Sequence, residues 1–295
     1  MPLEKIPTSK MFILEYHEVD KGKYIEKKIS ILTSNFSVAY AYLLVPKNVE
    51  FPAPAIMAMH QHGGTKYGAK EVIGEIGDPS LSYGKELAER GYVVFAMDAS
   101  SFGGRQDFNN DSFSIKEQRA AQDLFKRGYS PLGIIVQEDL VSLDFLSSLD
   151  FVDKENIGCI GHSFGGVRCM YLSALDNRVK ATVLSSSVAN LKFNYEIGNT
   201  HTWLTILPGV ASVTETSGIL ALIAPRPLMI VYTENDPIFV AREAEEQIGV
   251  LNGLYNKLEK KENLDIVKIP NKGHEFPLKY HEQAYQFFDN NLKTN

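Results

Sequence analysis

One serine in the chain lies in a setting that could make it a nucleophile. Ser163 is the middle residue of a Gly-His-Ser-Phe-Gly stretch at 161–165, and Gly166 follows it. The apolar run at 156–160 predicts a buried strand, and residues 167–175 predict a helix. In a sharp strand-to-helix turn, glycines avoid clashes and the central side chain is lifted above the sheet. The stretch therefore favours a nucleophilic serine over the alternative, an ordinary serine in a glycine-rich turn.

A serine hydroxyl needs a general base, and the base needs a carboxylate that orients it. After a strand-turn-helix of this kind, the expected chain order is serine, acid, histidine. Of the seven histidines, His274 lies in the loop after the last predicted strand, 264–269. We predict that His274 is the base, with a surface loop histidine as the alternative. His281 falls in the closing helix, where a solvated surface position is expected.

The acid should follow an earlier strand on the same edge of the sheet. Residues 228–232 predict a strand, and Glu234, Asn235, Asp236 and Pro237 come directly after it. Asp236 is the predicted acid, because Pro237 fixes the backbone of the turn and suits the start of a helix. Glu234 is the second choice. The alternative role of Asp236 is an ordinary helix N-cap.

Two backbone amides should hold the oxyanion that forms during acyl transfer. The amide of Phe164 lies at the start of the helix after the serine, where negative charge is stabilised. The second amide is expected from the loop at 60–64, which follows a predicted strand at 55–59. His62 is the predicted donor, with Gly63 beside it. Two histidines in one loop could also bind a metal, but no carboxylate or cysteine is nearby in the sequence, so no metal site is predicted.

The elements that must position these residues alternate between short apolar strands and helices. The alternation predicts a mostly parallel central sheet with helices on both faces, and ligands at the carboxyl ends of its strands. Residues 11–45 predict an antiparallel hairpin at the N-terminal edge of this α/β fold. Further strands are expected at 92–97 and 179–187, and helices at 81–90, 114–127, 133–149, 238–261 and 278–292. Ser114 and Glu117 are expected to form a capping box.

We expect a single domain over residues 1–295. Residues 188–222 are too long for a simple connection and are expected to form a small cap insertion beside the site. Trp203 in this segment, together with Phe102 and Phe239, is predicted to contact the substrate. The alternative is that the aromatic side chains of the segment pack into the core against the sheet.

Bulk composition limits the partners and the compartment. The chain has 44% hydrophobic residues and a formal net charge of −6, without a block of basic residues. We therefore expect no nucleic-acid partner and no membrane partner. Cys159 and Cys169 are expected to be buried free thiols, and no signal peptide is recognised, so a cytoplasmic location is predicted. A homo-oligomer remains open.

The chain resembles the α/β-hydrolase superfamily over nearly its whole length. Within it, the chain is similar to the dienelactone-hydrolase and acetyl-xylan-esterase-like group. This similarity rests on the loop at 60–64 and on residues 97–105, 152–157 and 273–276. The resemblance implies a serine esterase without a metal or organic cofactor. The chain departs from dienelactone hydrolases proper, which have a cysteine in place of Ser163, and from longer secreted esterases, which carry a signal peptide.

The leading hypothesis is a serine hydrolase that cleaves small carboxylic esters through an acyl-enzyme, with acetyl to butyryl as the preferred acyl groups. Two alternatives are kept. One is a serine peptidase of the prolyl-oligopeptidase type, although the chain has no room for that group's propeller domain. The other is a non-catalytic binding protein with the same fold. Asp98 and Arg105 are expected to stabilise the loop that carries them.

Overall fold

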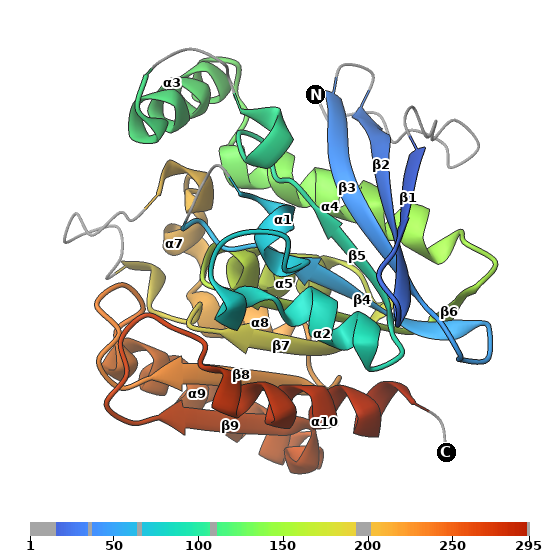
Figure 1. Cartoon of the computed structure of the whole chain (residues 1–295). Helices are drawn as coiled ribbons and strands as arrows, with labels where there is room; N and C mark the ends of the chain where they lie inside the picture. The colour runs from blue at the N-terminus through green and yellow to red at the C-terminus, as the bar shows by residue number, and fades with distance from the viewer. Residues whose placement is uncertain (1–15, 35–36, 64–66, 107–110, 193–201, 294–295) are drawn as a thin grey trace.

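The computed structural model describes residues 16–34, 37–63, 67–106, 111–192 and 202–293. In these residues a nine-stranded sheet runs through the molecule, with helices on both faces (Figure 1). Its strands lie in the order β1-β2-β3-β5-β4-β6-β7-β8-β9. The strand bounds are β1 Tyr16–Asp20, β2 Tyr24–Ser34, β3 Ser37–Pro46, β4 Ala53–Met59, β5 Val93–Met97, β6 Val152–His162, β7 Val179–Ser185, β8 Leu228–Thr233 and β9 Leu264–Ile269.

Helices follow the parallel strands and return the chain to the opposite edge of the sheet. Their bounds are α1 Ala69–Val72, α2 Tyr83–Glu89, α3 Phe113–Lys126, α4 Pro131–Ser147, α5 Phe164–Leu175, α7 Val210–Val213, α8 Thr216–Ala221, α9 Ala241–Lys257 and α10 His281–Leu292. Single 3-10 turns lie at Pro79–Leu81, Gly103–Arg105, Trp203–Thr205 (η4), Lys261–Asn263 and Leu278–Tyr280. The carboxyl ends of strands β4 to β9 therefore all lie at the same end of the sheet.

The sheet is parallel from β5 through β4 to β9, and antiparallel from β1 to β3. The two parts join where β3 pairs antiparallel with β5. All residues of β5 and β8 are buried, because helices cover both faces of the sheet there. The predicted fold class is confirmed, including the antiparallel N-terminal hairpin.

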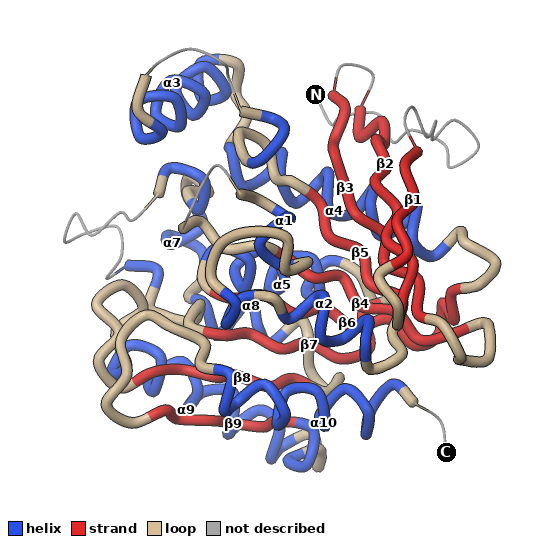
Figure 2. The backbone as a smooth tube through the Cα atoms, in the orientation of Figure 1, coloured by secondary structure: helices blue, strands red, loops and turns tan. Residues whose placement is uncertain are grey.

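Helices lie on both faces of the sheet (Figure 2). An apolar core lies on each of the two faces, between the helices and the sheet. One core contains side chains of α1, α2 and α10, among them Tyr83 and Phe288. The other contains side chains of α4, α5, α8 and α9, among them Leu143 and Leu251. The sheet is thus the middle of three layers, and loops cover the carboxyl ends of its parallel strands.

Element boundaries differ from the sequence expectation at several points. Pro54 lies inside β4 and not before it, at a shift of register with β6 where a proline costs no ladder bond. The segment 188–222, for which the sequence predicts no regular element, folds in its described part into η4, α7 and α8. The capping box is wrong: Ser112 precedes α3, no side chain caps the helix, and the Glu117 carboxylate binds other partners.

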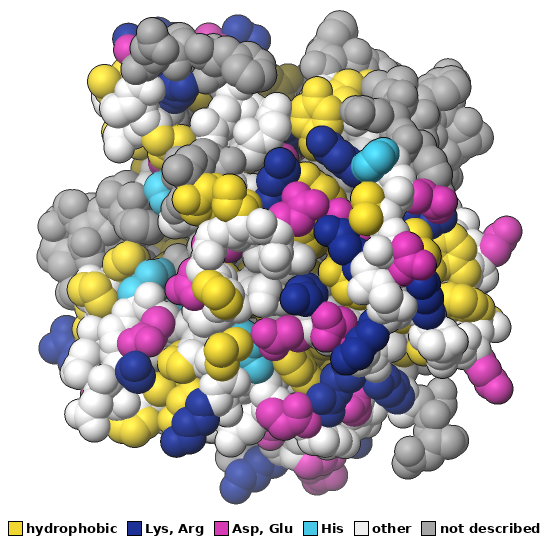
Figure 3. All heavy atoms as spheres, viewed as in Figure 1, with side chains coloured by type: hydrophobic (Ala, Val, Ile, Leu, Met, Phe, Trp, Pro, Cys, Tyr) yellow, Lys and Arg dark blue, Asp and Glu magenta, His cyan; other side chains and the backbone are white. Residues whose placement is uncertain are grey.

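The described surface carries charges of both signs. On the face shown in Figure 3, lysine and arginine side chains are interspersed with aspartate and glutamate side chains. Across the described ranges, no helix has both the length and the apolar character needed to cross a bilayer.

Candidate active site

Ser163 lies in the turn between β6 and α5, in a backbone conformation that favours glycine. Its φ is 56° and its ψ is −124°, a strained combination for a residue with a side chain. The amide of Ser163 donates to the carbonyl of Ser185 at 2.8 Å, which holds the turn against β7. A Cβ atom on Gly165 would lie 2.1 Å from the carbonyl oxygen of Met59, so only glycine fits there. The predicted sharp turn is therefore present, and neighbouring backbone enforces it.

Two later loops bring His274 and Asp236 to this serine. His274 Nε2 lies 2.7 Å from Ser163 Oγ, and His274 Nδ1 lies 2.8 Å from Asp236 Oδ2. Because a carboxylate only accepts, Nδ1 carries the proton, and Nε2 is then free to accept the serine proton. The structure thus brings together the three residues predicted from sequence. Glu234, the second choice, instead accepts a hydrogen bond from the amide of Asn271 at 2.9 Å.

The carboxylate of Asp236 is fixed by the turn it belongs to. Its Oδ1 accepts from the amides of Ile238 at 2.8 Å and Phe239 at 2.9 Å. Burial alone would raise the pKa of Asp236, but the hydrogen bond and charge of His274 and the two amides lower it below its ordinary value. Asp236 is therefore ionised at neutral pH and can stabilise a protonated His274.

A second histidine lies against His274. The ring of His162 is buried, 4.8 Å from the His274 ring between centroids, and its Nδ1 lies 3.1 Å from Ser185 Oγ. Burial, together with the nearby His274, lowers the pKa of His162 to about 3. The His162 imidazole is therefore neutral in the folded protein at neutral pH and in mild acid.

This buried histidine should make folding stability fall in acid. The unfolded chain takes up a proton on His162 below about pH 6.5, whereas the folded chain does so only near pH 3. Between these values the unfolded state binds more protons, so stability is lost as pH falls, by up to about 1.4 kcal/mol per pH unit. Urea unfolding at pH 7, 6 and 5 should show a smaller loss for His162→Asn than for the natural chain. Equal losses in the two proteins would contradict this assignment.

The loop after β4 is held by His60. The ring of His60 is buried, its Nε2 accepts from the amide of Ala99 at 3.0 Å, and its Nδ1 lies 2.8 Å from the carbonyl of Gln61. These partners require a proton on Nδ1 and none on Nε2. Burial lowers the pKa of His60 well below its usual range. His60 is thus a neutral structural histidine beneath the loop that carries His62 and Gly63.

His62 lies beside the turn that carries the serine. Its ring is edge-on to the ring of Phe164 at 6.5 Å between centroids, and to Phe113 at 5.3 Å. Its Nε2 lies 2.8 Å from Glu117 Oε2 on α3. The loop at 60–63 therefore borders the start of α5, where a second amide would have to lie. Oxyanion binding by the amides of Phe164, His62 and Gly63 stays a prediction.

A known protein family matches more than half of this chain. Residues 2–193 match the family model Abhydrolase_7, described as the Abhydrolase family. The chain belongs to the Abhydrolase family. The Bacillus subtilis (strain 168) protein named "Putative hydrolase YtaP" is 30% identical to it over 221 residues, which are 74% of this chain and 72% of that protein.

Solved structures of other proteins share the fold of this Abhydrolase family chain. Glucuronoyl esterase from Solibacter usitatus superposes with a TM-score of 0.68 at 14% identity, over 95% of this chain and 85% of that one. Acetyl xylan esterase 1 from Thermoanaerobacterium sp. JW/SL YS485 gives a TM-score of 0.64 at 17% identity, over 97% and 91%. At these identities the likeness shows the fold alone, and the expected α/β-hydrolase fold is confirmed.

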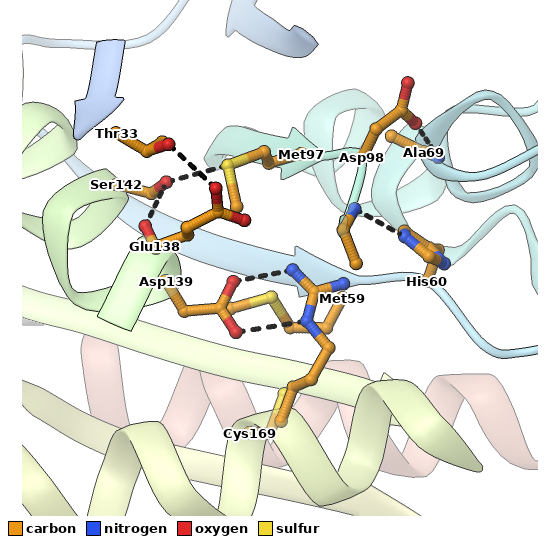
Figure 4. Close-up of polar contacts among 12 residues, drawn as sticks. Thr33, Met59, His60, Ala69, Met97, Asp98, Glu138, Asp139, Ser142 and Cys169 are labelled. Atoms are coloured by element: carbon orange, nitrogen blue, oxygen red, sulfur yellow. Dashed lines mark hydrogen bonds and ion pairs between the residues drawn. The ribbon is translucent and has the colours of Figure 1, made fainter. Parts of the chain in front are cut away.

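The Abhydrolase family chain also contains a buried ion pair that the sequence analysis did not single out. Arg168 on α5 and Asp139 on α4 are both fully buried, with nitrogen–oxygen distances of 2.6 Å and 3.0 Å. In Figure 4, dashed lines join both carboxylate oxygens of Asp139 to its partner. The guanidinium carbon lies 5.8 Å from the centre of the Phe164 ring. An arginine five residues after the serine, on an otherwise apolar helix, was the sequence feature that could have revealed this pair.

Asp98 and Arg105 stabilise their loop, as expected. Asp98 accepts from the amides of Ala69 at 2.8 Å and Gly104 at 2.9 Å. Arg105 donates to the carbonyl of Asp98 at 3.1 Å and to both oxygens of the buried Glu138, at 2.7 Å and 2.6 Å. The loop after β5 is thus tied to α1 and α4.

The residues predicted to contact substrate occupy different environments. Phe102 has no exposed surface; its ring stacks on Phe164 and lies tilted against His60, and its predicted substrate contact stays a prediction. Phe239 is nearly buried and stacks on the His274 ring at 5.8 Å between centroids. Trp203 is 37% exposed, at the start of η4. Only Trp203 offers substantial free surface, and part of the expected cap, residues 193–201, lies outside the described residues.

His281 is buried, which corrects the expectation of a solvated position. It begins α10, where its Nδ1 lies 2.9 Å from Glu86 Oε2 and its Nε2 lies 3.2 Å from the carbonyl of Phe276. It therefore anchors the loop that carries His274 to α2. Cys159 and Cys169 are buried free thiols, as expected. No group of three or more possible metal ligands occurs in the part of the chain that the structure describes.

Proposed function

We propose that this protein is a serine hydrolase that cleaves small carboxylic esters through an acyl-enzyme. The observation that carries the proposal is the position of His274, within 2.8 Å of both Ser163 and Asp236. The strained turn at Ser163 and membership of the Abhydrolase family support it. Proteins with the same fold that are named as esterases make an ester the first substrate class to test.

In the proposed reaction, Ser163 Oγ attacks the ester carbonyl while His274 Nε2 takes its proton. Asp236 holds His274 in the required tautomer and stabilises the imidazolium. The amides of Phe164 and His62 or Gly63 bind the oxyanion. His274 then protonates the leaving alcohol, and a water molecule that has lost its proton to His274 releases the acid from the serine. No cofactor enters these steps.

Two assays test the proposal together. Labelling with a fluorophosphonate reports an activated serine, and nitrophenyl esters of increasing acyl length report the substrate class. Labelling and turnover are expected in the natural chain, whereas Ser163→Ala should show no labelling and only a small residual turnover. Labelling without ester turnover would favour another acyl substrate, and absence of both would overturn the proposal. The cytoplasmic location, the oligomeric state and the lack of nucleic-acid or membrane partners stay predictions.

Trp203 should influence the choice of acyl chain, because its indole is partly exposed. Its backbone amide also donates a hydrogen bond to Glu117, the residue that contacts His62. Trp203→Ala should change the ratio of kcat/KM for butyrate to that for octanoate by about tenfold, the order expected for reshaping an apolar pocket. Thermal stability should fall little, since the side chain is not fully buried. Val250→Ala, which alters an exposed apolar residue on α9, is the control. A large loss of stability with an unchanged ratio would make Trp203 a core residue.

A further inference from the structure

Glu117 is a buried carboxylate that joins two loops at the candidate site. It lies on α3 with 3% of its surface exposed. Its Oε2 lies 2.8 Å from His62 Nε2 in the loop after β4. Its Oε1 accepts hydrogen bonds from the hydroxyl of Thr202 and the amide of Trp203. One side chain thus binds both the proposed oxyanion loop and the beginning of η4.

The surroundings of Glu117 indicate that this burial serves the two loops. Within α3, only Glu117 and Ala121 are buried, and most other side chains of the helix are exposed. A buried carboxylate is costly unless hydrogen bonds compensate it. Burial alone would raise the pKa of Glu117, but the bonds from His62, Thr202 and Trp203 lower it below its ordinary value. The side chain is therefore ionised at neutral pH, and both oxygens act as acceptors.

The rings around His62 leave it little freedom once Glu117 is bonded. The ring meets Phe102 edge-on at 5.6 Å and Phe113 edge-on at 5.3 Å between centroids. Phe102 in turn stacks on Phe164, the residue after the serine, at 5.5 Å. The imidazole is held by a carboxylate at one end and by aromatic rings at its sides. The backbone of the loop at 60–63 is fixed through this side chain.

We infer that Glu117 is a positioning residue, which sets the His62 loop and the Trp203 segment in one arrangement around the reacting carbonyl. The inference rests on the proposed function, because it gives the His62 loop an oxyanion-binding role. A donor that acts mainly on the oxyanion affects kcat more than KM. Loss of Glu117 should therefore lower kcat, and it should loosen both loops together.

The test compares Glu117→Gln and Glu117→Ala with the natural chain. Glutamine keeps the length of the side chain but replaces one carboxylate oxygen by an NH₂ group. That group cannot accept a hydrogen bond from the donors on its side. We expect kcat for nitrophenyl acetate to fall by about tenfold in Glu117→Gln and by up to about 100-fold in Glu117→Ala, less than or comparable with loss of a whole oxyanion donor. KM should change less than about threefold, because ground-state contacts are largely kept. Asp123→Asn, a neutralised carboxylate on the exposed face of α3, is the matched control.

Hydrogen exchange gives a second reading that needs no turnover. In Glu117→Gln, exchange should rise at residues 60–63 and at 202–205, and remain unchanged there in Asp123→Asn. If Glu117→Ala does not fold, Glu117→Gln and Thr202→Val carry the test. A kcat within twofold of the control, or faster exchange in only one of the two loops, would overturn the inference. If the natural chain shows neither ester turnover nor fluorophosphonate labelling, the proposed function fails instead, and exchange alone decides whether Glu117 couples the loops.

Discussion

Ser163→Ala should lower ester turnover by about a thousand-fold or more while the protein remains folded. The variant lacks the oxygen that His274 Nε2 contacts at 2.7 Å, so no acyl-enzyme can form. The residual rate should resemble that of water attacking a bound ester. Steady-state kinetics with nitrophenyl acetate, checked by fluorophosphonate labelling, measure this effect.

The fold of the variant should survive, because the turn is built from backbone contacts and not from the hydroxyl. Alanine keeps the hydrogen bond from the backbone amide of residue 163 to the carbonyl of Ser185, and it keeps the close approach of Gly165 to Met59. Ser148→Ala, at an exposed serine after α4, is the matched control and should keep full activity. A folded Ser163→Ala protein with near-natural turnover would remove Ser163 from the nucleophile's role.

Asp139→Ala should destabilise the fold by about 3–5 kcal/mol, because it leaves the Arg168 charge buried without a partner. Both side chains of the pair are 0% exposed. Arg168 Nη1 already has no hydrogen-bond partner among the described residues, so the remaining charge cannot easily be satisfied. Urea unfolding at pH 7 measures the loss.

Two further variants show whether burial causes this effect. Asp123→Ala breaks an exposed ion pair with Arg127 on α3 and should cost less than about 1 kcal/mol. Replacing both buried partners, as Asp139→Leu with Arg168→Met, should recover much of the lost stability, since no charge then lies in the core. Equal losses for Asp139→Ala and Asp123→Ala would show that the buried pair contributes no more than an exposed one.

The sequence predicts those parts of the molecule that are encoded locally. The strand-turn-helix around Ser163 is a contiguous pattern, and chain order with strand ends was enough to choose Asp236 and His274. The structure brings these three residues together. Their catalytic roles remain for the experiments above to decide.

Residues whose partners are distant in the chain were assigned wrongly or not at all. Glu117 has the spacing of a capping box with Ser114, but the side chain binds His62 and Thr202, 55 and 85 residues away. The complete burial of Phe102 among neighbouring rings was likewise not foreseen from its place in the sequence. His281 has the pattern of an exposed helical residue, and only the fold places Glu86 beside it. Contacts between distant segments decide burial, and no local pattern encodes them.

The order of the strands has a consequence for incomplete chains. Asp236 and His274 follow β8 and β9, the last two strands added outside β7. A polypeptide that stopped before β8 would carry Ser163 with no base to activate it. It would also present β7, six of whose seven residues are buried in the complete protein, as an unpaired apolar edge open to pairing with other chains. Premature termination is therefore expected to produce insoluble aggregates and not a weakened enzyme, and Ser163 can meet Asp236 and His274 only after the segment that carries β8 and β9 has been synthesised.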